Sequence, residues 1–450
     1  MKSRVPFVTM LLLLMWSMVF SQVNASEFDD NWPTWRGPLF SGEAVKGSPP
    51  TIWSETKNVK WKIPIPGKGL STPVIWGDQI FITSAVSLDK KASAEAVKKL
   101  KEAQPLWLRT TGSGNVPEYI QQFVVYSINR NNGEITWQRV VREQFPHEGT
   151  HKNGSFASQS CATDGEYLIA SFGSYGIYCF DLKGNMIWEK DLGDMSIRAS
   201  FGEGSSPVLY KDFLVINWDH EKDSYIFVLN KTNGDVIWKK ERDEITSWST
   251  PLVVEVKGIP QLIVTATGKS IAYDLNNGDI IWEISGLTAN VIPSPVTDGK
   301  MVYLMSGYRG NALQTVKLEE ASGDLKDSPA LVWAYDKNTP YVPSPLLYNS
   351  RLYYLRGNDE RLSCVDAKTG KIHYEAQKLD GMKGVYASPV AANGIVYVLG
   401  RNGVCYALQD SVEFKVVSKN QLDDHFDASP AIVGNELYLR GLKNLYCIAE

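Results

Sequence analysis

Cysteine and histidine are both scarce in this sequence, with five residues of each among 450. No two cysteines are adjacent, and none form the closely spaced pairs of a structural zinc site. The 46 basic and 50 acidic side chains nearly cancel, to a net charge of −4. A chain with this balance lacks the basic excess typical of nucleic-acid-binding proteins. We therefore expect neither a nucleic-acid partner nor a metal site.

Long apolar runs are lacking as well, apart from one near the N-terminus. Residues 8–20 are mostly apolar, follow two basic residues and precede small residues that end before Ser26. The run is too short for a membrane span and no second run follows, which predicts a secretory signal peptide over residues 1–25. Residues 26–450 should then be exported, to the periplasm or out of the cell, as one monomeric domain. No cysteine stands at the expected cleavage point, so we expect no lipid anchor.

What the sequence does contain is a repeat. A small residue, usually followed by proline, recurs eight times, and from the second occurrence onward the copies lie 41 to 50 residues apart. The eight motifs are Ser71-Thr72-Pro73, Ser160-Cys161-Ala162, Ser206-Pro207, Thr250-Pro251, Ser294-Pro295, Ser344-Pro345, Ser388-Pro389 and Ser429-Pro430. A period of this length, with short β-rich runs in each unit, is typical of propeller blades. The sequence therefore predicts an all-β fold, an eight-bladed β-propeller with four strands in each blade.

The second half of each unit is equally regular, because a glycine precedes an aromatic residue by four positions. The pairs are Gly133 and Trp137, Gly184 and Trp188, Gly234 and Trp238, Gly278 and Trp282, and Gly370 and Tyr374. Glycine supplies the positive φ that a tight turn between strands requires. The aromatic ring offers a large apolar surface that can pack on the neighbouring blade. We expect these docking contacts to close the ring without disulfides or metals.

The last unit ends one strand short of a full blade. Residues 59–63 form an isolated β-rich run that carries Trp61. Pairing of this run with the final blade would join the two ends of the chain and remove an exposed sheet edge. Cys179, Cys364 and Cys447 hold the same strand position in three different blades, too far apart for bridges. We expect the cysteines to be buried free thiols.

One segment interrupts the repeat. Residues 87–105, inserted in the first blade, mix alanine and other apolar residues with lysine and glutamate, which predicts a surface helix. Ser87 or Asp89 would cap its start, and Pro105 would end it. The helix is either an ornament on the ring or a lid over one end of it.

Three features together resemble one known group of proteins. They are the Ser-Pro motif, the Asp-x-x-x-Gly-x-x-x-Trp turn from Asp274 to Trp282, and the eightfold count of units. In these features the chain is similar, over nearly all of its mature length, to the quinoprotein-like superfamily of PQQ-type β-propellers. Residues 32–38 (Trp-Pro-Thr-Trp-Arg-Gly-Pro) and 217–221 (Asn-Trp-Asp-His-Glu) resemble an exported bacterial group within it. The resemblance implies the propeller fold and leaves several functions open, because fold alone does not decide function.

The resemblance implies two alternative functions. A PQQ-dependent oxidoreductase of this superfamily would bind PQQ and calcium and would carry an adjacent cysteine pair at the cofactor, which this sequence lacks. A non-catalytic envelope assembly scaffold would instead bind a protein partner, and it fits the length and the expected export. Such scaffolds usually carry a lipid-anchor cysteine, and none stands at the expected cleavage point. Both alternatives stay open at this point.

A third function follows from arginines at equivalent ring positions. Arg309, Arg356, Arg401 and Arg440 each follow the second strand of a blade, in four successive blades. If they face one funnel, their guanidinium groups would grip a carboxylate or sulfate; if each pairs with a local acid, they are structural. The other candidate ligand-binding residues on the same face are Lys152, Arg198, Asp219, Arg242, Trp248 and His425.

Histidines on the loops of this face favour a chemical role. His147, His151 and His220 can each accept a proton near neutral pH, and Tyr175 can serve as acid or base. When a cation neutralises a substrate carboxylate, the proton next to that carboxylate becomes acidic, as β-elimination from uronic acids requires. We therefore expect an exported propeller that binds an acidic saccharide in an Arg- and His-lined central funnel. Elimination (lyase) chemistry there is our hypothesis, with the scaffold and the oxidoreductase as alternatives.

Overall fold

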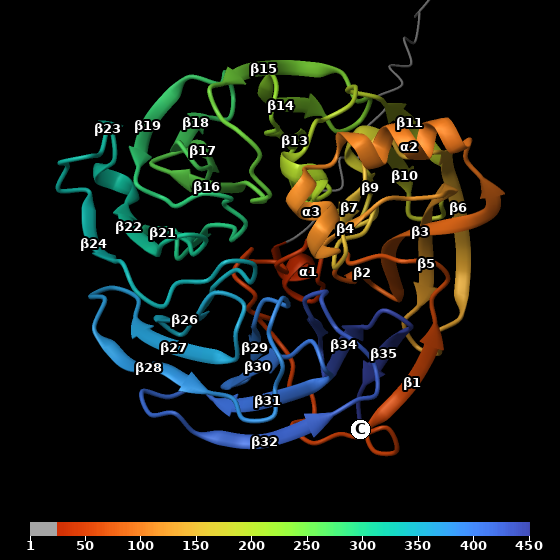
Figure 1. The fold of residues 1–450 in the computed structure, drawn as a ribbon. Helices are drawn as coiled ribbons and strands as arrows, with labels where there is room; N and C mark the ends of the chain where they lie inside the picture. Colours follow the sequence, from red (N-terminus) through yellow and green to blue (C-terminus); the bar gives the residue numbers. More distant parts are fainter. Residues whose placement is uncertain (1–24) are drawn as a thin grey trace, which may run out of the picture.

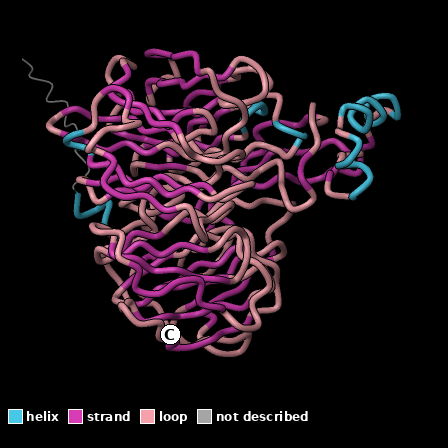
Figure 2. Tube along the Cα trace, turned by 60° about the vertical axis from the view of Figure 1, so that its left-hand side comes forward, coloured by secondary structure: helices cyan, strands magenta, loops and turns pink. Residues whose placement is uncertain are grey.

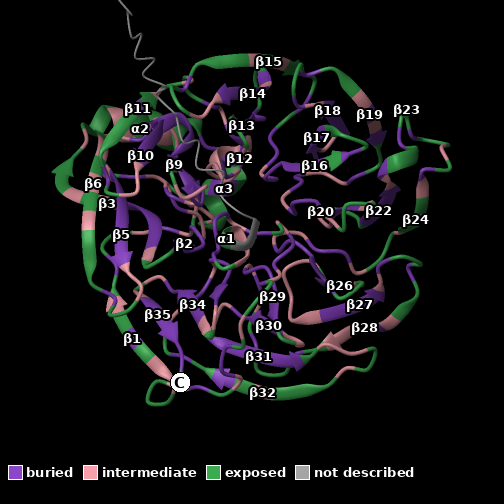
Figure 3. Cartoon of the chain, turned by 180° about the vertical axis from the view of Figure 1, so that it is seen from behind, coloured by how far each residue is buried: buried purple, intermediate pink, exposed green. Residues whose placement is uncertain are grey.

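The computed structural model describes residues 25–450, and the predicted leader lies outside them except for Ala25. The described chain folds as a ring of eight blades around a central axis, as the repeat predicted (Figure 1). The inner strands of the blades are buried, while the outermost strands expose much of their surface (Figure 3). The fold class predicted from the sequence is therefore confirmed.

Each blade is an antiparallel sheet of four strands that follow one another from the axis to the rim. The first contains β2 (Val74–Trp76), β3 (Gln79–Lys91), β5 (Tyr119–Asn129) and β6 (Ile135–Gln144), and the second β8 (Ala162–Thr163), β9 (Tyr167–Ser171), β10 (Ile177–Asp181) and β11 (Met186–Lys190). The third contains β12 (Val208–Tyr210), β13 (Phe213–Trp218), β14 (Ser224–Asn230) and β15 (Val236–Arg242), and the fourth β16 (Leu252–Val256), β17 (Ile259–Val264), β18 (Lys269–Asp274) and β19 (Ile280–Ser285). A short strand, β23 (Gly323–Asp324), extends the fourth blade by pairing in parallel with β19.

The remaining four blades follow the same order. The fifth contains β20 (Val296–Thr297), β21 (Met301–Ser306), β22 (Ala312–Lys317) and β24 (Leu331–Tyr335), and the sixth β25 (Leu346–Tyr348), β26 (Arg351–Leu355), β27 (Arg361–Asp366) and β28 (Ile372–Lys378). The seventh contains β29 (Val390–Ala392), β30 (Ile395–Leu399), β31 (Val404–Gln409) and β32 (Val416–Gln421), and the eighth β33 (Ala431–Val433), β34 (Glu436–Arg440), β35 (Asn444–Ile448) and β1 (Val59–Pro64).

The eighth blade joins the two ends of the chain. Its outermost strand is β1, which pairs antiparallel with β35 and places Trp61 opposite Cys447. The predicted closure of the ring by an N-terminal strand is therefore confirmed. All five cysteines are buried and free, also as expected.

Tryptophans on the rim strands connect blades to their neighbours. In five blades, the indole Nε1 donates to a backbone carbonyl of the following blade at 2.8 to 3.2 Å: Trp61 to Arg130, Trp137 to Leu182, Trp188 to Lys231, Trp238 to Leu275 and Trp333 to Ala367. The indole ring also lies against the turn glycine of that blade, as Trp188 does against Gly234. The repeated glycine thus meets two demands, a positive φ and room for the neighbouring ring.

Nearer the axis, the repeated serine or threonine links the blades in a second way. Its hydroxyl accepts a hydrogen bond from the backbone N–H of the equivalent residue in the preceding blade. Seven such bonds of 2.9 to 3.0 Å follow one another around the ring: Thr72 to Ser160, Ser160 to Ser206, Ser206 to Thr250, Thr250 to Ser294, Ser294 to Ser344, Ser344 to Ser388 and Ser388 to Ser429. Between the eighth and first blades, Arg440 donates to the carbonyl and hydroxyl oxygens of Ser71. We call the seven bonds the hydroxyl belt.

The N-terminal segment lies across one end of the central axis. α1 (Ala25–Asp29) is at the centre of the ring in the views from the front and from behind (Figures 1 and 3). Beyond it, Arg36 is buried and donates to the carbonyl oxygens of Pro389 at 3.1 Å and Pro345 at 2.9 Å. These carbonyls belong to the Ser-Pro motifs of two blades. The segment 32–38 therefore plugs the ring.

The insertion in the first blade contains two helices rather than one. β3 continues to Lys91, so Ser87 and Asp89 lie in a strand and cap no helix. The first helix, α2 (Ala94–Ala103), begins after Ser93, whose hydroxyl accepts a hydrogen bond from the N–H of Ala96. The expected helix therefore exists within the predicted segment but begins later, because strand pairing extends beyond the regular blade.

Pro105 does not simply end this insertion. It stands at the N-terminus of a second helix, α3 (Leu106–Thr111), which ends at a left-handed Gly112. Figure 2 shows α2 and α3 projecting on the side of the disc away from α1. A two-stranded sheet of β4 (Gly114–Asn115) and β7 (Thr150–His151) follows α3. Within residues 25–450, no helix is long and apolar enough to cross a membrane.

The turn glycines allow the cost of a positive φ to be separated from the cost of crowding a tryptophan. Gly234 has φ +73° and a Cβ there would lie 2.9 Å from the Trp188 ring, whereas Gly258 has φ +82° and open space around it. We expect Gly258→Ala to cost about 1–2 kcal/mol, from backbone strain alone. Gly234→Ala should cost about 1–3 kcal/mol more, because the ring must move.

Urea denaturation of both variants measures this difference through the midpoint at an unchanged m value. Equal losses in the two variants would show that the tryptophan contact does not constrain the turn.

Candidate functional site

One residue from every blade lines a single cavity on the axis. Each stands two positions before the serine or threonine of the hydroxyl belt, on the loop that leads into the innermost strand. The eight residues are Leu70, Ser158, Gly204, Trp248, Ile292, Val342, Tyr386 and Asp427. They surround a volume of about 430 Å³. We call this space the axial cavity.

Aromatic side chains from other loops complete its wall. Trp35 from the plugging segment, Trp107 from α3 and Phe201 all line the cavity, and Tyr308 stacks on Tyr341 with ring centres 4.8 Å apart. Trp107 is 52% exposed and meets Phe201 edge to face at 6.1 Å. It is therefore α3, rather than α2, that extends over the cavity as part of its mouth.

His151 and Asn153 are among the polar residues that line the cavity. The Nδ1 atom of His151 accepts the backbone N–H of Asn153 at 3.2 Å, so the neutral ring carries its proton on Nε2. Burial lowers the pKa of His151, and the positive charges of Lys152, Arg401 and Lys68 lower it further. His151 is thus a neutral donor at pH 7. Asn153 donates from Nδ2 to the Tyr386 hydroxyl at 3.2 Å.

An ion pair occupies the part of the wall near the eighth blade. Arg401 donates from Nε to Oδ1 of Asp427 at 2.6 Å, and its guanidinium lies 3.9 Å from the centre of the Tyr386 ring. His425 lies 3.1 Å from the second carboxylate oxygen. Burial works to raise the pKa of Asp427, but hydrogen bonds from His425 and Arg401 hold it below its ordinary value. The acid on this wall is therefore ionised and already paired.

The four arginines at equivalent strand ends do not form the expected ring. Arg401 and Arg356 pair with local acids, the latter with Asp359 at 2.7 Å. Arg440 is buried between blades, where burial lowers its pKa to about 9, and Arg309 is exposed over the Tyr308 ring. The expectation of one arginine-lined funnel is therefore wrong. The same strand position fixes where a side chain starts, but local acids and carbonyls decide where it points.

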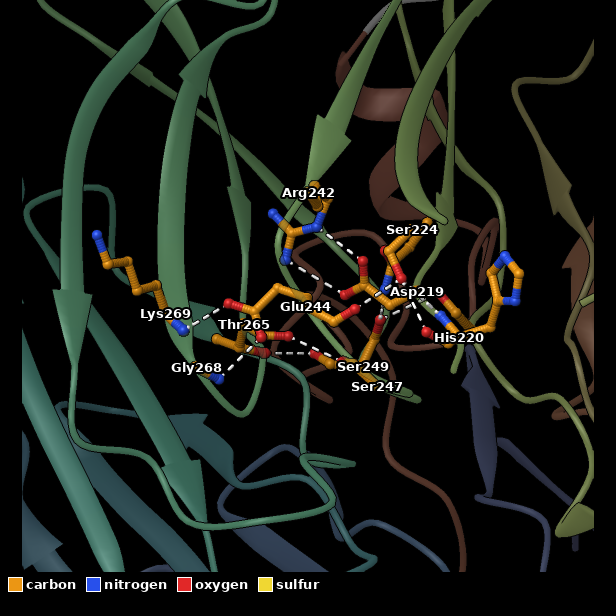
Figure 4. A network of polar contacts seen from close by, with 12 residues as sticks. Asp219, His220, Ser224, Arg242, Glu244, Ser247, Ser249, Thr265, Gly268 and Lys269 are labelled. Carbon is orange, nitrogen blue, oxygen red and sulfur yellow. Dashed lines mark hydrogen bonds and ion pairs between the residues drawn. The ribbon is translucent and has the colours of Figure 1, made fainter. Parts of the chain in front are cut away.

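Asp219 and Arg242, expected to bind ligand, instead hold blades together. Arg242 donates to both carboxylate oxygens of Asp219, at 2.7 and 3.2 Å (Figure 4). It also donates to the Tyr273 hydroxyl at 2.8 Å. Both charged side chains are completely buried. Because Tyr273 belongs to the fourth blade and Arg242 to the third, the network connects the two blades.

Of the four candidate catalytic residues, only His151 lines the axial cavity. Both ring nitrogens of His220 are engaged, Nδ1 by the N–H of Ser196 at 3.1 Å and Nε2 by the Asp223 carbonyl at 3.0 Å. Tyr175 is 4% exposed and stacks on Phe123 at 4.3 Å, and burial raises its pKa well above the ordinary value. The structure therefore does not bring the four candidates together at the axial cavity, although His147 and Tyr175 lie side by side elsewhere, with ring centres 5.4 Å apart.

His147 lies in a smaller cavity beside the axial one, with Tyr175 and Glu203, a residue not predicted from the sequence. Glu203 accepts hydrogen bonds from both the N–H and the hydroxyl of Ser174, and it lines both cavities. The surrounding protein desolvates its carboxyl group and raises its pKa to about 7. Its place between two glycines just before a Ser-Pro motif was the signal that could have identified it. Glu148, nearby, has its pKa raised by burial as well.

Of the remaining candidates, Trp248 lines the axial cavity and donates from Nε1 to the Gly202 carbonyl at 2.7 Å. Lys152 is exposed beside His151, and Arg198 lies close enough to Tyr341 for its charge to favour the ionised phenol. The loop from residue 198 to residue 202 contains two consecutive left-handed residues, Ala199 and Ser200. Such strain is sustained only where surrounding contacts fix the backbone.

The donors at the axis do not fit a calcium-bound quinone. The carboxylates that line the axial cavity are Glu203 and Asp427, of which one accepts two hydrogen bonds from Ser174 and the other pairs with Arg401. Among the described residues, no group of three or more His, Cys, Asp or Glu side chains is placed to hold a metal ion. We derive no oxidation step from this site.

The eight-bladed fold and its repeat define a PQQ-type repeat β-propeller. The family model described as outer membrane protein assembly factor BamB matches residues 44–240 and 222–448, so the chain belongs to this family. A protein of that name from Yersinia pestis is 23% identical over 299 residues, which cover 64% of this chain and 67% of the relative.

Solved structures are similar in fold. BamB from Moraxella catarrhalis matches 81% of this chain and 98% of its own length, with a TM-score of 0.51 and 13% identity. The quinohemoprotein alcohol dehydrogenase ADHIIG from Pseudomonas putida HK5 matches 94% of this chain and 80% of its own length, with a TM-score of 0.58 and 9% identity. At these identities the structural likeness shows the propeller and nothing about activity.

Breaking the buried ion pair of Asp219 and Arg242 should cause a large loss of stability. Arg242→Met leaves the Asp219 carboxylate buried without its partner, and we expect a loss of about 3–5 kcal/mol. Arg356→Met is the matched control, because its pair with Asp359 is 44% and 35% exposed. It should cost less than about 1 kcal/mol. Urea denaturation compares the two, and similar losses would contradict the structural role of Arg242.

The raised pKa of Glu203 predicts that stability depends on pH. The folded chain holds this proton more tightly than the unfolded chain, so the contribution is full in acid and is lost as pH rises through about 7. We expect the free energy of unfolding to fall between about pH 4 and 7, and Glu203→Gln to remove much of that fall. The exposed Glu189→Gln should leave it intact. An unchanged profile in Glu203→Gln would assign the titration to another group.

Proposed function

We propose that this chain is a non-catalytic scaffold that binds a protein partner in the bacterial envelope. The observation that carries the proposal is membership, from residue 44 to residue 448, of a family described as an outer membrane protein assembly factor. The relative from Yersinia pestis bears the same description and is matched over two thirds of its length. A partner among the proteins that assemble the outer membrane is therefore the first to test.

The way the chain uses its charged groups supports binding rather than catalysis. Arg242 and Arg440 are buried between blades, and His220 has both ring nitrogens engaged. Elimination from a uronic acid would need a base and a carboxylate clamp at one place, and His151 is the one catalytic candidate that reaches the axial cavity. We do not propose the elimination step. The binding of an acidic ligand is a separate matter, because it needs only a charged cavity.

A periplasmic location follows from the same proposal. The expected leader would export the chain, and a scaffold for outer-membrane assembly would work on the periplasmic side of that membrane. The described residues include no helix that could span that membrane.

The proposed scaffold function predicts that the chain binds a specific protein partner. We expect in-cell crosslinking followed by affinity purification to recover an identified component of the outer-membrane assembly machinery. Deletion of the gene should lower the amount of outer-membrane proteins.

Recovery of the chain alone, together with unchanged outer-membrane proteins after deletion, would contradict the scaffold function. Recovery of unrelated soluble proteins would also contradict the scaffold function.

A further inference from the structure

The axial cavity is built as a ligand site, although the scaffold function does not require one. Its volume of about 430 Å³ falls within the range of small-molecule sites. Trp35 lies on the side where the N-terminal segment plugs the ring, and Trp107 forms part of the mouth on the side of α3. A ligand of one or two sugar-sized rings would fill a space of this size.

The wall presents flat apolar surfaces from several directions. Trp35, Trp248 and Tyr386 lie on different loops, and the stacked pair of Tyr308 and Tyr341 adds a further aromatic surface. Such surfaces pack against the flat apolar face of a ring-shaped ligand and gain little from an extended chain. They account for the shape of the ligand but not for its polarity.

Polar groups with unused capacity indicate that the ligand is hydroxylated. The Nε2 atom of neutral His151 is a donor, and the Oδ1 atom of Asn153 is an acceptor; within residues 25–450 neither has a hydrogen-bond partner. A wholly apolar ligand would exclude water from both atoms and leave them unpaired, which would weaken its binding. Ring hydroxyls would satisfy both.

Positive charges around the cavity indicate an acidic group on the ligand. Lys68, Lys152, Arg198 and Arg309 are all next to lining residues or close enough to affect their pKa values, and none forms an ion pair with a described residue. Of the two carboxylates that line the cavity, Asp427 is already neutralised by Arg401, and burial raises the pKa of Glu203 to about 7, so that it is only partly ionised at neutral pH. The excess of positive charge, focused by the surrounding protein, favours an anion.

We propose that the axial cavity binds a saccharide of one or two rings that carries a carboxylate. The aromatic wall would hold the ring faces, His151 and Asn153 would pair with hydroxyls, and the surrounding lysines and arginines would attract the carboxylate. This inference does not depend on the scaffold function, since it is argued from the residues that line the cavity alone. The two can fail separately.

The test is calorimetric titration of the protein with digalacturonate and with cellobiouronate. Galactobiose is the neutral control and benzoate the aromatic acid control. We expect one of the two acidic disaccharides to bind with one-to-one stoichiometry and to weaken as salt is added. Galactobiose and benzoate should each bind at least about tenfold more weakly, because each lacks one part of the required chemistry.

Neighbouring residues on α3 supply a matched pair of variants. Trp107 lines the cavity and Leu106 does not, and both are mostly exposed, at 52% and 67%, so neither change should unfold the chain. Trp107→Ala should weaken binding about two- to tenfold and Leu106→Ala should leave it unchanged. Lys152→Gln should weaken it about two- to fivefold, whereas Lys326→Gln, distant on the outer edge of the ring, should not.

Three results would overturn the proposal. The first is that neither acidic disaccharide binds at millimolar concentration. The second is that galactobiose binds as tightly as the acidic sugars, and the third is that Leu106→Ala and Trp107→Ala weaken binding equally.

Discussion

The hydroxyl belt is the constraint from which the rest of the molecule follows. Each backbone N–H in the belt is buried near the axis and needs an acceptor, and a serine or threonine of the next blade supplies it at 2.9 to 3.0 Å. This fixes the distance of every innermost strand from the axis. It also places the residue two positions earlier at the axis. The axial cavity is therefore lined by one residue per blade because the belt sets the same register in all of them.

The belt has no bond between the eighth and first blades, where Arg440 links the two blades instead, and a second buried arginine, Arg36, links the sixth and seventh blades. Arg440 donates to oxygens of Ser71 and Thr83, and Arg36 donates to the carbonyls of two Ser-Pro motifs. Neither forms an ion pair with a described acid, and burial lowers the pKa of each to about 9. A guanidinium can serve at these positions because it offers five donors in a fixed plane, enough to satisfy several carbonyls that no strand pairs. These hydrogen bonds offset the cost of burying the charge.

The repeat made the ring predictable, and the same repeat led to a wrong prediction for the site. The number of blades, the docking of the tryptophans and the closure by residues 59–64 all depend on spacing, which the sequence displays. The direction of a side chain depends on partners distant in the sequence, so Arg401 reaches Asp427 while Arg440 turns between blades. The cavity lining could have been found by comparing the residue two before each belt serine. Trp107 and Trp35 could not, because they come from segments outside the repeat.

The N-terminal segment gives the cavity and the closing blade a physical connection. Trp35 forms part of the cavity wall, and the same stretch of chain continues past Arg36 and the seventh blade to β1, the strand that closes the ring. Beyond Arg36, the N–H of Ala44 donates to the Ala391 carbonyl, and the N–H of Trp53 donates to the side chain of Asn420. A ligand that rests on Trp35 therefore touches a segment anchored at both the axis and the closing blade. The same segment leads on to the junction of the two chain ends, which is the one place in the described chain where the ring is held by strand pairing instead of by a continuous chain.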